Sequence, residues 1–93
     1  MLDFEWDDAK AAANFRKHGV TFAQAAYAFR DPFAVEWIDE RAVHGEERII
    51  LLGMSGGQIL SVVYTERGER IRIISARRAT KHEKDNYFRQ NAT

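Results

Sequence analysis

The hydrophobic pattern around which the chain is organised lies in its second half. A β-branched run from Ile59 to Thr65 is followed by Gly68 and by a second run from Arg70 to Ser75. Two such runs joined by a short link that contains glycine predict a β-hairpin. Thr80-Lys-His-Glu83 then has the spacing of a capping box, which predicts a helix from about Lys81 to Arg89.

Helical signals dominate the first third of the chain. Asp7 suits an N-cap, and a helix is predicted from Asp8 to Lys17, with Gly19 in a left-handed position after its end. The alanines of this helix, together with Phe15, are expected to let it approach a sheet closely.

A second helix is predicted to begin at the capping box Thr21-Phe-Ala-Gln24. It is predicted to end at Asp31-Pro32, because a residue that precedes proline disfavours helical geometry. Apolar residues recur in this segment at helical spacing. The face expected to be buried consists of Phe22, Ala25, Ala26, Phe29 and Phe33.

Shorter apolar runs predict the remaining strands. A short edge strand is predicted at 2–5, a strand at 34–39, and another at 48–53. The continuous Ile-Ile-Leu-Leu of this last strand indicates a position inside the sheet, and Ser55-Gly56-Gly57 supplies the turn that follows. The predicted order is therefore β-α-α-β-β-β-β-α. It describes an α+β fold in which two helices pack on a mostly antiparallel sheet and a C-terminal helix lies at the edge.

Length and composition narrow the class of protein. A chain of 93 residues, with 45% hydrophobic and 30% charged residues, is predicted to form one globular domain over residues 1–93. The absence of cysteine excludes disulfides, thiolate metal sites and a cysteine nucleophile. Neither a signal segment nor an apolar run of membrane-spanning length is found, so a cytoplasmic location without membrane contact is expected.

The formal net charge is zero, but the charges are distributed unevenly. Residues 1–47 contain five Lys or Arg and ten Asp or Glu, whereas residues 48–93 contain nine Lys or Arg and four Asp or Glu. The excess of basic residues in the second half suits a face that binds an anionic ligand, because guanidinium groups bind phosphates well. The alternative explanation is a sheet surface on which these arginines form salt bridges. The predicted hairpin and its exit carry Arg67, Arg70, Arg72, Arg77 and Arg78.

Metal and nucleophilic catalysis find little support in the sequence. His18, His44 and His82 lie far apart, and no two of them have the spacing of metal ligands, so neither a metal nor a cofactor is predicted. The chain also lacks a glycine-rich phosphate loop and a G-x-S-x-G elbow.

Electrostatic catalysis suits the residues better. RNA can be cleaved without a metal when the ribose 2′-hydroxyl attacks the adjacent phosphate, provided that a base accepts the proton and cations stabilise the transition state. The start of the strand at 48–53 is expected to reach Arg67 or Arg77 across the sheet, and simple salt bridges between these groups are the alternative. The residues concerned are His44, Glu46, Glu47 and Arg48.

Motifs along nearly the whole chain occur in an order that is specific in combination. The N-terminal ones are Phe4-Glu-Trp-Asp7, Lys10, Asn14, Lys17-His-Gly-Val20, Phe22, Ala25 and Phe29-x-Asp-Pro32. The C-terminal ones are Glu46-Glu-Arg48, Gly53, Tyr64-Thr-Glu-Arg67 and Arg72-Ile-Ile-Ser-Ala-Arg77, with Ala79, Glu83 and Tyr87. With these motifs the chain resembles the BrnT toxins of type II toxin–antitoxin systems.

This resemblance implies a RelE-like fold and a metal-independent endoribonuclease that halts translation. The catalytic residues that it implies are Arg67, Arg77, Arg48 and Glu47, and the predicted RNA contacts are Arg72, Arg78 and Lys17. His18 is explained at least as well by capping or packing the end of its helix as by contact with RNA, and it is not included in the predicted catalytic set. Tyr87 is explained better by anchoring the last helix than by a role at the site.

The same resemblance implies a protein partner. A BrnA-like antitoxin with a ribbon-helix-helix DNA-binding part is expected to fold on the toxin, in a heterotetramer that contains two toxins. Operator DNA would then be bound only through the antitoxin. Two other functions stay open: a non-catalytic module that holds an acidic or nucleic-acid partner on its basic sheet, and a toxin fold that has lost activity.

Overall fold

The computed structural model describes residues 2–41 and 45–92, and it confirms the predicted α+β order of elements. Its elements are β1 (Asp3–Glu5), α1 (Asp8–His18), α2 (Phe22–Ala28), β2 (Val35–Ile38), β3 (Ile49–Ser55), β4 (Gln58–Arg67), β5 (Arg70–Arg78) and α3 (Lys81–Asn91). No helix in the described ranges is long and apolar enough to span a membrane.

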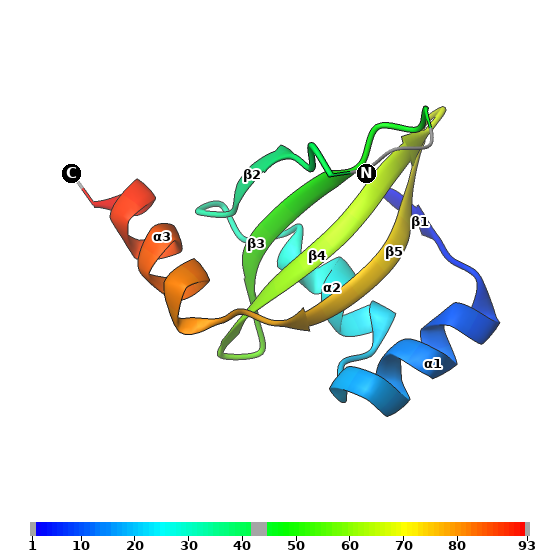
Figure 1. Ribbon diagram of the computed structural model, residues 1–93, viewed down its shortest axis with the longest axis horizontal. Helices are drawn as coiled ribbons and strands as arrows, with labels where there is room; N and C mark the ends of the chain where they lie inside the picture. The colour runs from blue at the N-terminus through cyan, green and yellow to red at the C-terminus, as the bar shows by residue number, and fades with distance from the viewer. Residues whose placement is uncertain (1, 42–44, 93) are drawn as a thin grey trace.

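The five strands form one mixed sheet in the order β1-β5-β4-β3-β2. β1 runs parallel to β5, and the other neighbours are antiparallel. The N-terminal edge strand and the interior position of β3 are therefore as predicted. In Figure 1, α2 crosses behind the central strands, α1 lies beyond it below β5, and α3 stands apart at the far left.

Local capping chemistry defines the helix ends, as the sequence predicts. Gly19 has a φ of 69° and ends α1 in the left-handed conformation. The Thr21 hydroxyl accepts a hydrogen bond from the Gln24 N–H at 3.0 Å, and the Gln24 side chain accepts one from the Thr21 N–H at 2.7 Å. Thr80 and Glu83 form the second capping box, at the start of α3.

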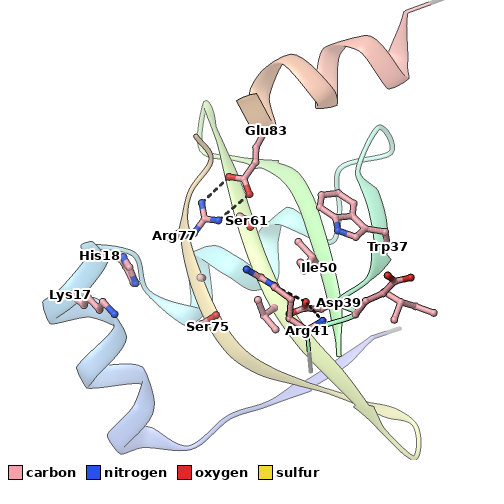
Figure 2. A pocket seen from close by; sticks show the side chains of 14 residues that line it. Lys17, His18, Trp37, Asp39, Arg41, Ile50, Ser61, Ser75, Arg77 and Glu83 are labelled. Atoms are coloured by element: carbon pink, nitrogen blue, oxygen red, sulfur yellow. Dashed lines mark hydrogen bonds and ion pairs between the residues drawn. The ribbon is translucent and has the colours of Figure 1, made fainter. Parts of the chain in front are cut away.

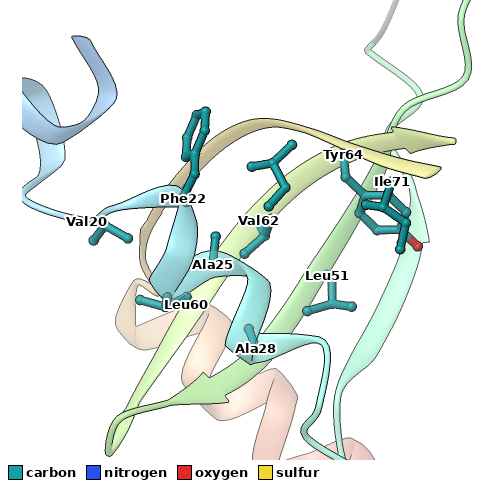
Figure 3. Packing of buried hydrophobic residues seen from close by; sticks show 11 residues of the cluster. Val20, Phe22, Ala25, Ala28, Leu51, Leu60, Val62, Tyr64 and Ile71 are labelled. Atoms are coloured by element: carbon teal, nitrogen blue, oxygen red, sulfur yellow. The ribbon is translucent and has the colours of Figure 1, made fainter. Parts of the chain in front are cut away.

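The main hydrophobic core lies between α2 and the sheet (Figure 3). Phe22 and Ala25 of α2 pack on Leu60 and Val62 of β4, and each of these side chains is at most 2% exposed. A Cβ atom at Gly53 of β3 would lie 2.5 Å from the Ala28 carbonyl oxygen, so the glycine allows α2 to approach this strand closely. These contacts position α2 firmly on the sheet.

α1 attaches to the sheet through a polar side chain. The buried Asn14 amide donates to the carbonyl oxygens of Val20 and Ala76, at 3.1 and 2.8 Å, and its oxygen accepts from the Ala76 N–H at 3.1 Å. The expectation that Phe15 faces the sheet is wrong, because its side chain is 53% exposed. Asn14, the residue next to Phe15, attaches α1 to the sheet instead.

The predicted extent of the second helix is also wrong at its end. α2 stops at Ala28, and Phe29 forms its C-cap. Phe33 therefore lies beyond the helix, and its side chain is 59% exposed instead of buried. Phe29 is partly buried, with its ring centroid 5.1 Å from that of Phe4 and 4.9 Å from that of Tyr64.

The opposite face of the sheet carries a smaller apolar cluster beneath α3. Leu52, Ile59, Ala79 and Tyr87 form it, and Tyr87 is 5% exposed, in keeping with its expected anchoring role. The Tyr87 hydroxyl also donates to an Asp31 carboxylate oxygen at 2.6 Å. α3 therefore covers one end of this face and leaves the remainder accessible.

Candidate functional site

An open groove of about 980 Å³ lies on the sheet face opposite α1 and α2 (Figure 2). In Figure 2, Lys17 and His18 border one side, Trp37 borders the other, and the Arg77–Glu83 pair lies between them. The lining residues are Lys17, His18, Trp37, Ile38, Asp39, Glu40, Arg41, Ile50, Ser61, Val63, Ser75, Ala76, Arg77 and Glu83. The groove thus collects side chains from both ends of the chain.

A register irregularity in β5 orients Arg77 toward this groove. Ile73 pairs with Tyr64 and Ser75 pairs with Val63, so Ile74 is an extra residue between two ladder pairs. Ile73 and Ala76 both belong to the core beneath the helices. Without the extra residue, strand alternation would turn position 77 to the same face as Ile73. The bulge therefore transfers Arg77 to the open face.

Arg77 is paired with a carboxylate from the first turn of α3. Its Nη1 and Nη2 atoms donate to Glu83 Oε1 and Oε2 at 2.8 and 3.0 Å. The hydrogen bond to Glu83 raises the pKa of Arg77 despite partial burial. Burial raises the pKa of Glu83, but the bonds from Arg77 and the Thr80 backbone outweigh it and lower the pKa. Both groups are therefore charged at neutral pH.

The rest of the groove has a mixed charge. Arg41 donates to Asp39 at 3.1 Å, and this hydrogen bond lowers the pKa of Asp39. Lys17 comes from the last turn of α1, at the helix end that Asn14 attaches to β5. The groove can therefore receive an anionic group beside Arg77 and Lys17 while carboxylates line other parts of it.

The residues predicted for catalysis fall into two separate places. Arg77 lines the groove and pairs in register with Ser61, whereas Arg67 lies at the β4–β5 turn. Arg67 lies six positions after Ser61 along β4, which corresponds to roughly 20 Å at about 3.3 Å per residue. One phosphate group cannot contact both guanidinium groups in this arrangement.

Glu47 and Arg48 lie at the same end as Arg67, just before β3. The Glu47 carbonyl accepts a hydrogen bond from the Thr65 hydroxyl at 2.8 Å. Arg67 Nε is 3.7 Å from Glu46 Oε1, as the salt-bridge alternative predicts for this pair. His44, which was predicted to belong to the same strand entry, lies outside the described residues.

The predicted RNA contacts are also divided. Lys17 lines the groove. Arg72 donates to Glu5 of the neighbouring β1 at 2.8 Å, and Arg78 donates to Gln58 at 3.0 Å. Among the described residues that line the groove, neither Arg72 nor Arg78 appears.

A family comparison agrees with the resemblance seen in the sequence. The family model described as "Ribonuclease toxin, BrnT, of type II toxin-antitoxin system" matches residues 6–83, which is well over half of the chain. The chain belongs to the BrnT family. A comparison with curated proteins found no match. Membership identifies a ribonuclease toxin family and implies an antitoxin partner.

Several groove residues of this BrnT family member were not predicted for the site. Trp37 and Arg41 enter it from β2 and the following turn, and Ser61 enters from β4. Their sequence neighbourhoods contain no chemical motif, so only the folded sheet brings them together. For Glu83 the sequence does contain a signal. The capping box fixes this residue at the start of α3, next to the strand that ends in Arg77 and Arg78.

Within residues 2–41 and 45–92, no group of three or more His, Asp or Glu side chains is arranged to hold a metal ion.

Proposed function

We propose that this BrnT family member is a metal-independent endoribonuclease whose reaction centre is the groove around Arg77. The observation that carries the proposal is the position of the Arg77 guanidinium, which lies in an open groove near Lys17 and is held by an ionised carboxylate. Two cations in a groove on a rigid sheet suit a phosphodiester and its more highly charged transition state. Family membership supports RNA as the substrate.

The proposed reaction is an internal transesterification. The ribose 2′-oxygen attacks the adjacent phosphorus, the bond from phosphorus to the 5′-oxygen breaks, and a 2′,3′-cyclic phosphate and a 5′-hydroxyl result. A base accepts the proton of the 2′-hydroxyl, and an acid donates one to the leaving 5′-oxygen. Arg77 binds the non-bridging phosphate oxygens as their negative charge grows, and Lys17 supports it.

His18 is our candidate for the proton acceptor. It lines the same groove as Arg77, and histidine is the side chain that most often acts as a general base. Glu83 suits this role less well, because its pKa is lowered by Arg77 and a weak base accepts a proton poorly. Packing at the helix end is the alternative role of His18.

Arg67, Arg48 and Glu47 form an alternative centre at the other end of the β4–β5 hairpin. Their grouping fits the catalytic set expected from the sequence, with Arg77 left out. Arg67 is 53% exposed and only loosely paired with Glu46, so it can also contact the RNA backbone. We propose the same peripheral role for Arg72 and Arg78.

We further propose that residues 1–93 act as one domain in the cytoplasm, where translated RNA is found. The partner is a BrnA-like antitoxin with a ribbon-helix-helix part, assembled with two toxins in a heterotetramer that binds operator DNA through the antitoxin. Family membership supports the antitoxin, and the resemblance described above supports its finer identity.

The test is RNA cleavage by the purified, partner-free protein in excess EDTA, on naked RNA and on mRNA bound to ribosomes. The expected products carry 2′,3′-cyclic phosphate and 5′-hydroxyl ends, and a 2′-deoxy residue at the cleavage position should abolish the reaction. Intact RNA in both forms, with the protein folded, would contradict the proposal and favour the non-catalytic binding module. Cleavage that occurs in the presence of a divalent metal ion but not in EDTA would contradict metal independence.

A further inference from the structure

Arg77 uses one edge of its guanidinium group within the protein and leaves the other edge available. Nη1 donates to Glu83 Oε1 at 2.8 Å and to the Arg78 carbonyl at 3.2 Å, and Nη2 donates once, to Glu83 Oε2 at 3.0 Å. A guanidinium group has five N–H donors. Within the described part of the chain, the Nε–H and the second Nη2–H therefore donate to no acceptor.

These two remaining donors form a second fork with the geometry that a phosphate accepts. The side chain of Arg77 is 41% exposed and lines the groove, so the fork is accessible to a ligand there. We infer that Glu83 is a positioning residue of the ribonuclease site, whose carboxylate holds the Nη1/Nη2 edge of Arg77 so that the Nε/Nη2 edge meets the phosphate of the RNA. This inference rests on the proposed function.

Glu83 is itself fixed before any ligand arrives. Its side chain is 18% exposed, and its Oε1 atom also accepts the Thr80 N–H at 2.8 Å. The Thr80 hydroxyl accepts the Glu83 backbone N–H at 3.2 Å, so this bond caps the helix and does not hold the carboxylate. The carboxylate is thus fixed to the first turn of α3, and α3 is held to the sheet by the buried Tyr87. Arg77 consequently loses rotamer freedom through folding and not through RNA binding.

The negative charge of Glu83 has two opposite effects on RNA. A carboxylate beside the phosphate site repels the ground-state phosphate, but it also holds the guanidinium in the orientation that the transition state requires. Loss of the charge should therefore slow the chemical step without weakening RNA binding. An Arg77 substitution should behave differently, because it removes the phosphate ligand itself.

The capping box offers a matched set of variants. Glu83→Gln keeps an N3 side chain that can still cap the helix, but it removes the ion pair with Arg77. Thr80→Ala removes the hydroxyl cap and leaves both carboxylate contacts with Arg77 in place. Asp85→Asn removes one negative charge from the exposed side of the same helix, where Asp85 pairs with Lys81 at 3.3 Å.

The experiment measures kcat and KM for each variant in EDTA, with the form of RNA that the wild-type protein cleaves. It also measures the Kd for an all-2′-deoxy oligonucleotide of the same sequence. For Glu83→Gln we expect kcat to fall on the order of 10- to 100-fold, as for a small displacement of a catalytic group. The Kd should be unchanged or tighter. Thr80→Ala and Asp85→Asn should stay within about threefold of wild type in kcat.

A Glu83→Gln variant with wild-type kcat would overturn the inference, and so would a Thr80→Ala variant with an equal loss, since the cap would then explain the effect. If the melting temperature shows that Glu83→Gln is unfolded, Arg77→Lys carries the test. Lysine keeps the charge but has no second fork, so kcat should fall nearly as far as in Arg77→Ala. Wild-type cleavage by Arg77→Ala would instead overturn the proposed reaction centre.

Discussion

The two faces of the sheet differ in what covers them. One face is covered by α1 and α2 and carries the larger core, in which the α2 side chains meet β4 directly. The other is covered by α3 only over the cluster around Leu52 and Tyr87, and the rest of it forms the groove that contains Arg77. Strand alternation separates the two faces, so neighbouring residues of one strand serve the core and the groove. Val62 in the core and Val63 in the groove lining, both in β4, are an example.

This division implies that stability and activity can be altered separately. Residues of the covered face should change the free energy of unfolding, whereas residues of the open face should change cleavage. Two connections between the faces are visible. Asn14 attaches the α1 end that carries Lys17, and Asp31 binds Tyr87 of α3.

The largest expected effect lies on the covered face. Phe22→Ala removes a side chain that is 2% exposed and should lower the free energy of unfolding by about 3–5 kcal/mol, because it leaves a cavity beneath α2. Denaturant titration measures this loss. Cleavage per folded molecule should be close to that of the wild type. A stable variant without activity would show that the two faces are not separable.

A substitution of Asn14 should lower the free energy of unfolding by less than Phe22→Ala does, but it should also reduce cleavage. Asn14→Ala leaves the buried carbonyls of Val20 and Ala76 without their donor, at a cost of about 1–3 kcal/mol for an unsatisfied group. It also loosens the helix end that carries Lys17, so cleavage should fall with stability. Leu2→Ala, at an exposed position on the N-terminal side, is the control. If Asn14→Ala were destabilised but cleaved RNA as fast as the wild type, Asn14 would not connect the two faces.

The smallest predicted effect concerns the attachment of α3 and its dependence on pH. Burial raises the pKa of Asp31, but hydrogen bonds from Tyr87 and the Met54 and Phe33 backbones lower it overall. Because the folded-state pKa is lowered, this stabilisation is present above the unfolded value of about 3.9 and is lost as pH falls through the folded pKa. Tyr87→Phe should cost about 1–2 kcal/mol at neutral pH.

Unfolding titrations at neutral pH and near pH 3 measure this dependence. The difference between wild type and Tyr87→Phe should shrink at the lower pH, where protonation of Asp31 weakens the bond in the wild type. A constant difference at both pH values would mean that the hydroxyl contributes through packing and not through its bond to the carboxylate.

Local patterns predicted the fold because its elements are defined by local chemistry. The capping boxes at Thr21 and Thr80 and the left-handed Gly19 set helix ends. The two runs on either side of Gly68 set the hairpin. The failures occurred where tertiary structure overrides spacing. Phe33 continues the helical spacing of α2, but the helix ends five residues earlier at Ala28.

The candidate site was predicted less completely, for a physical reason. Arg67 and Arg77 belong to one hairpin in the sequence, yet the antiparallel ladder puts them at opposite ends of it. The extra residue Ile74 reverses the facing of the last part of β5, and no residue type in the sequence announces such a bulge. Trp37 and His18 line opposite sides of the groove and come from distant segments, which only the assembled sheet brings to one site.

The most direct test of the central claim compares Arg77→Ala with Arg67→Ala in the EDTA cleavage assay, with a melting curve for each. Both variants remove one partly exposed arginine from the same hairpin, Arg67 from β4 and Arg77 from β5, so they match in the charge that is lost. The groove assignment predicts a loss of at least about 100-fold for Arg77→Ala, and a change of only a few-fold for Arg67→Ala. Loss of cleavage in Arg67→Ala with activity retained in a folded Arg77→Ala would contradict it and move the reaction centre to the turn end of the hairpin.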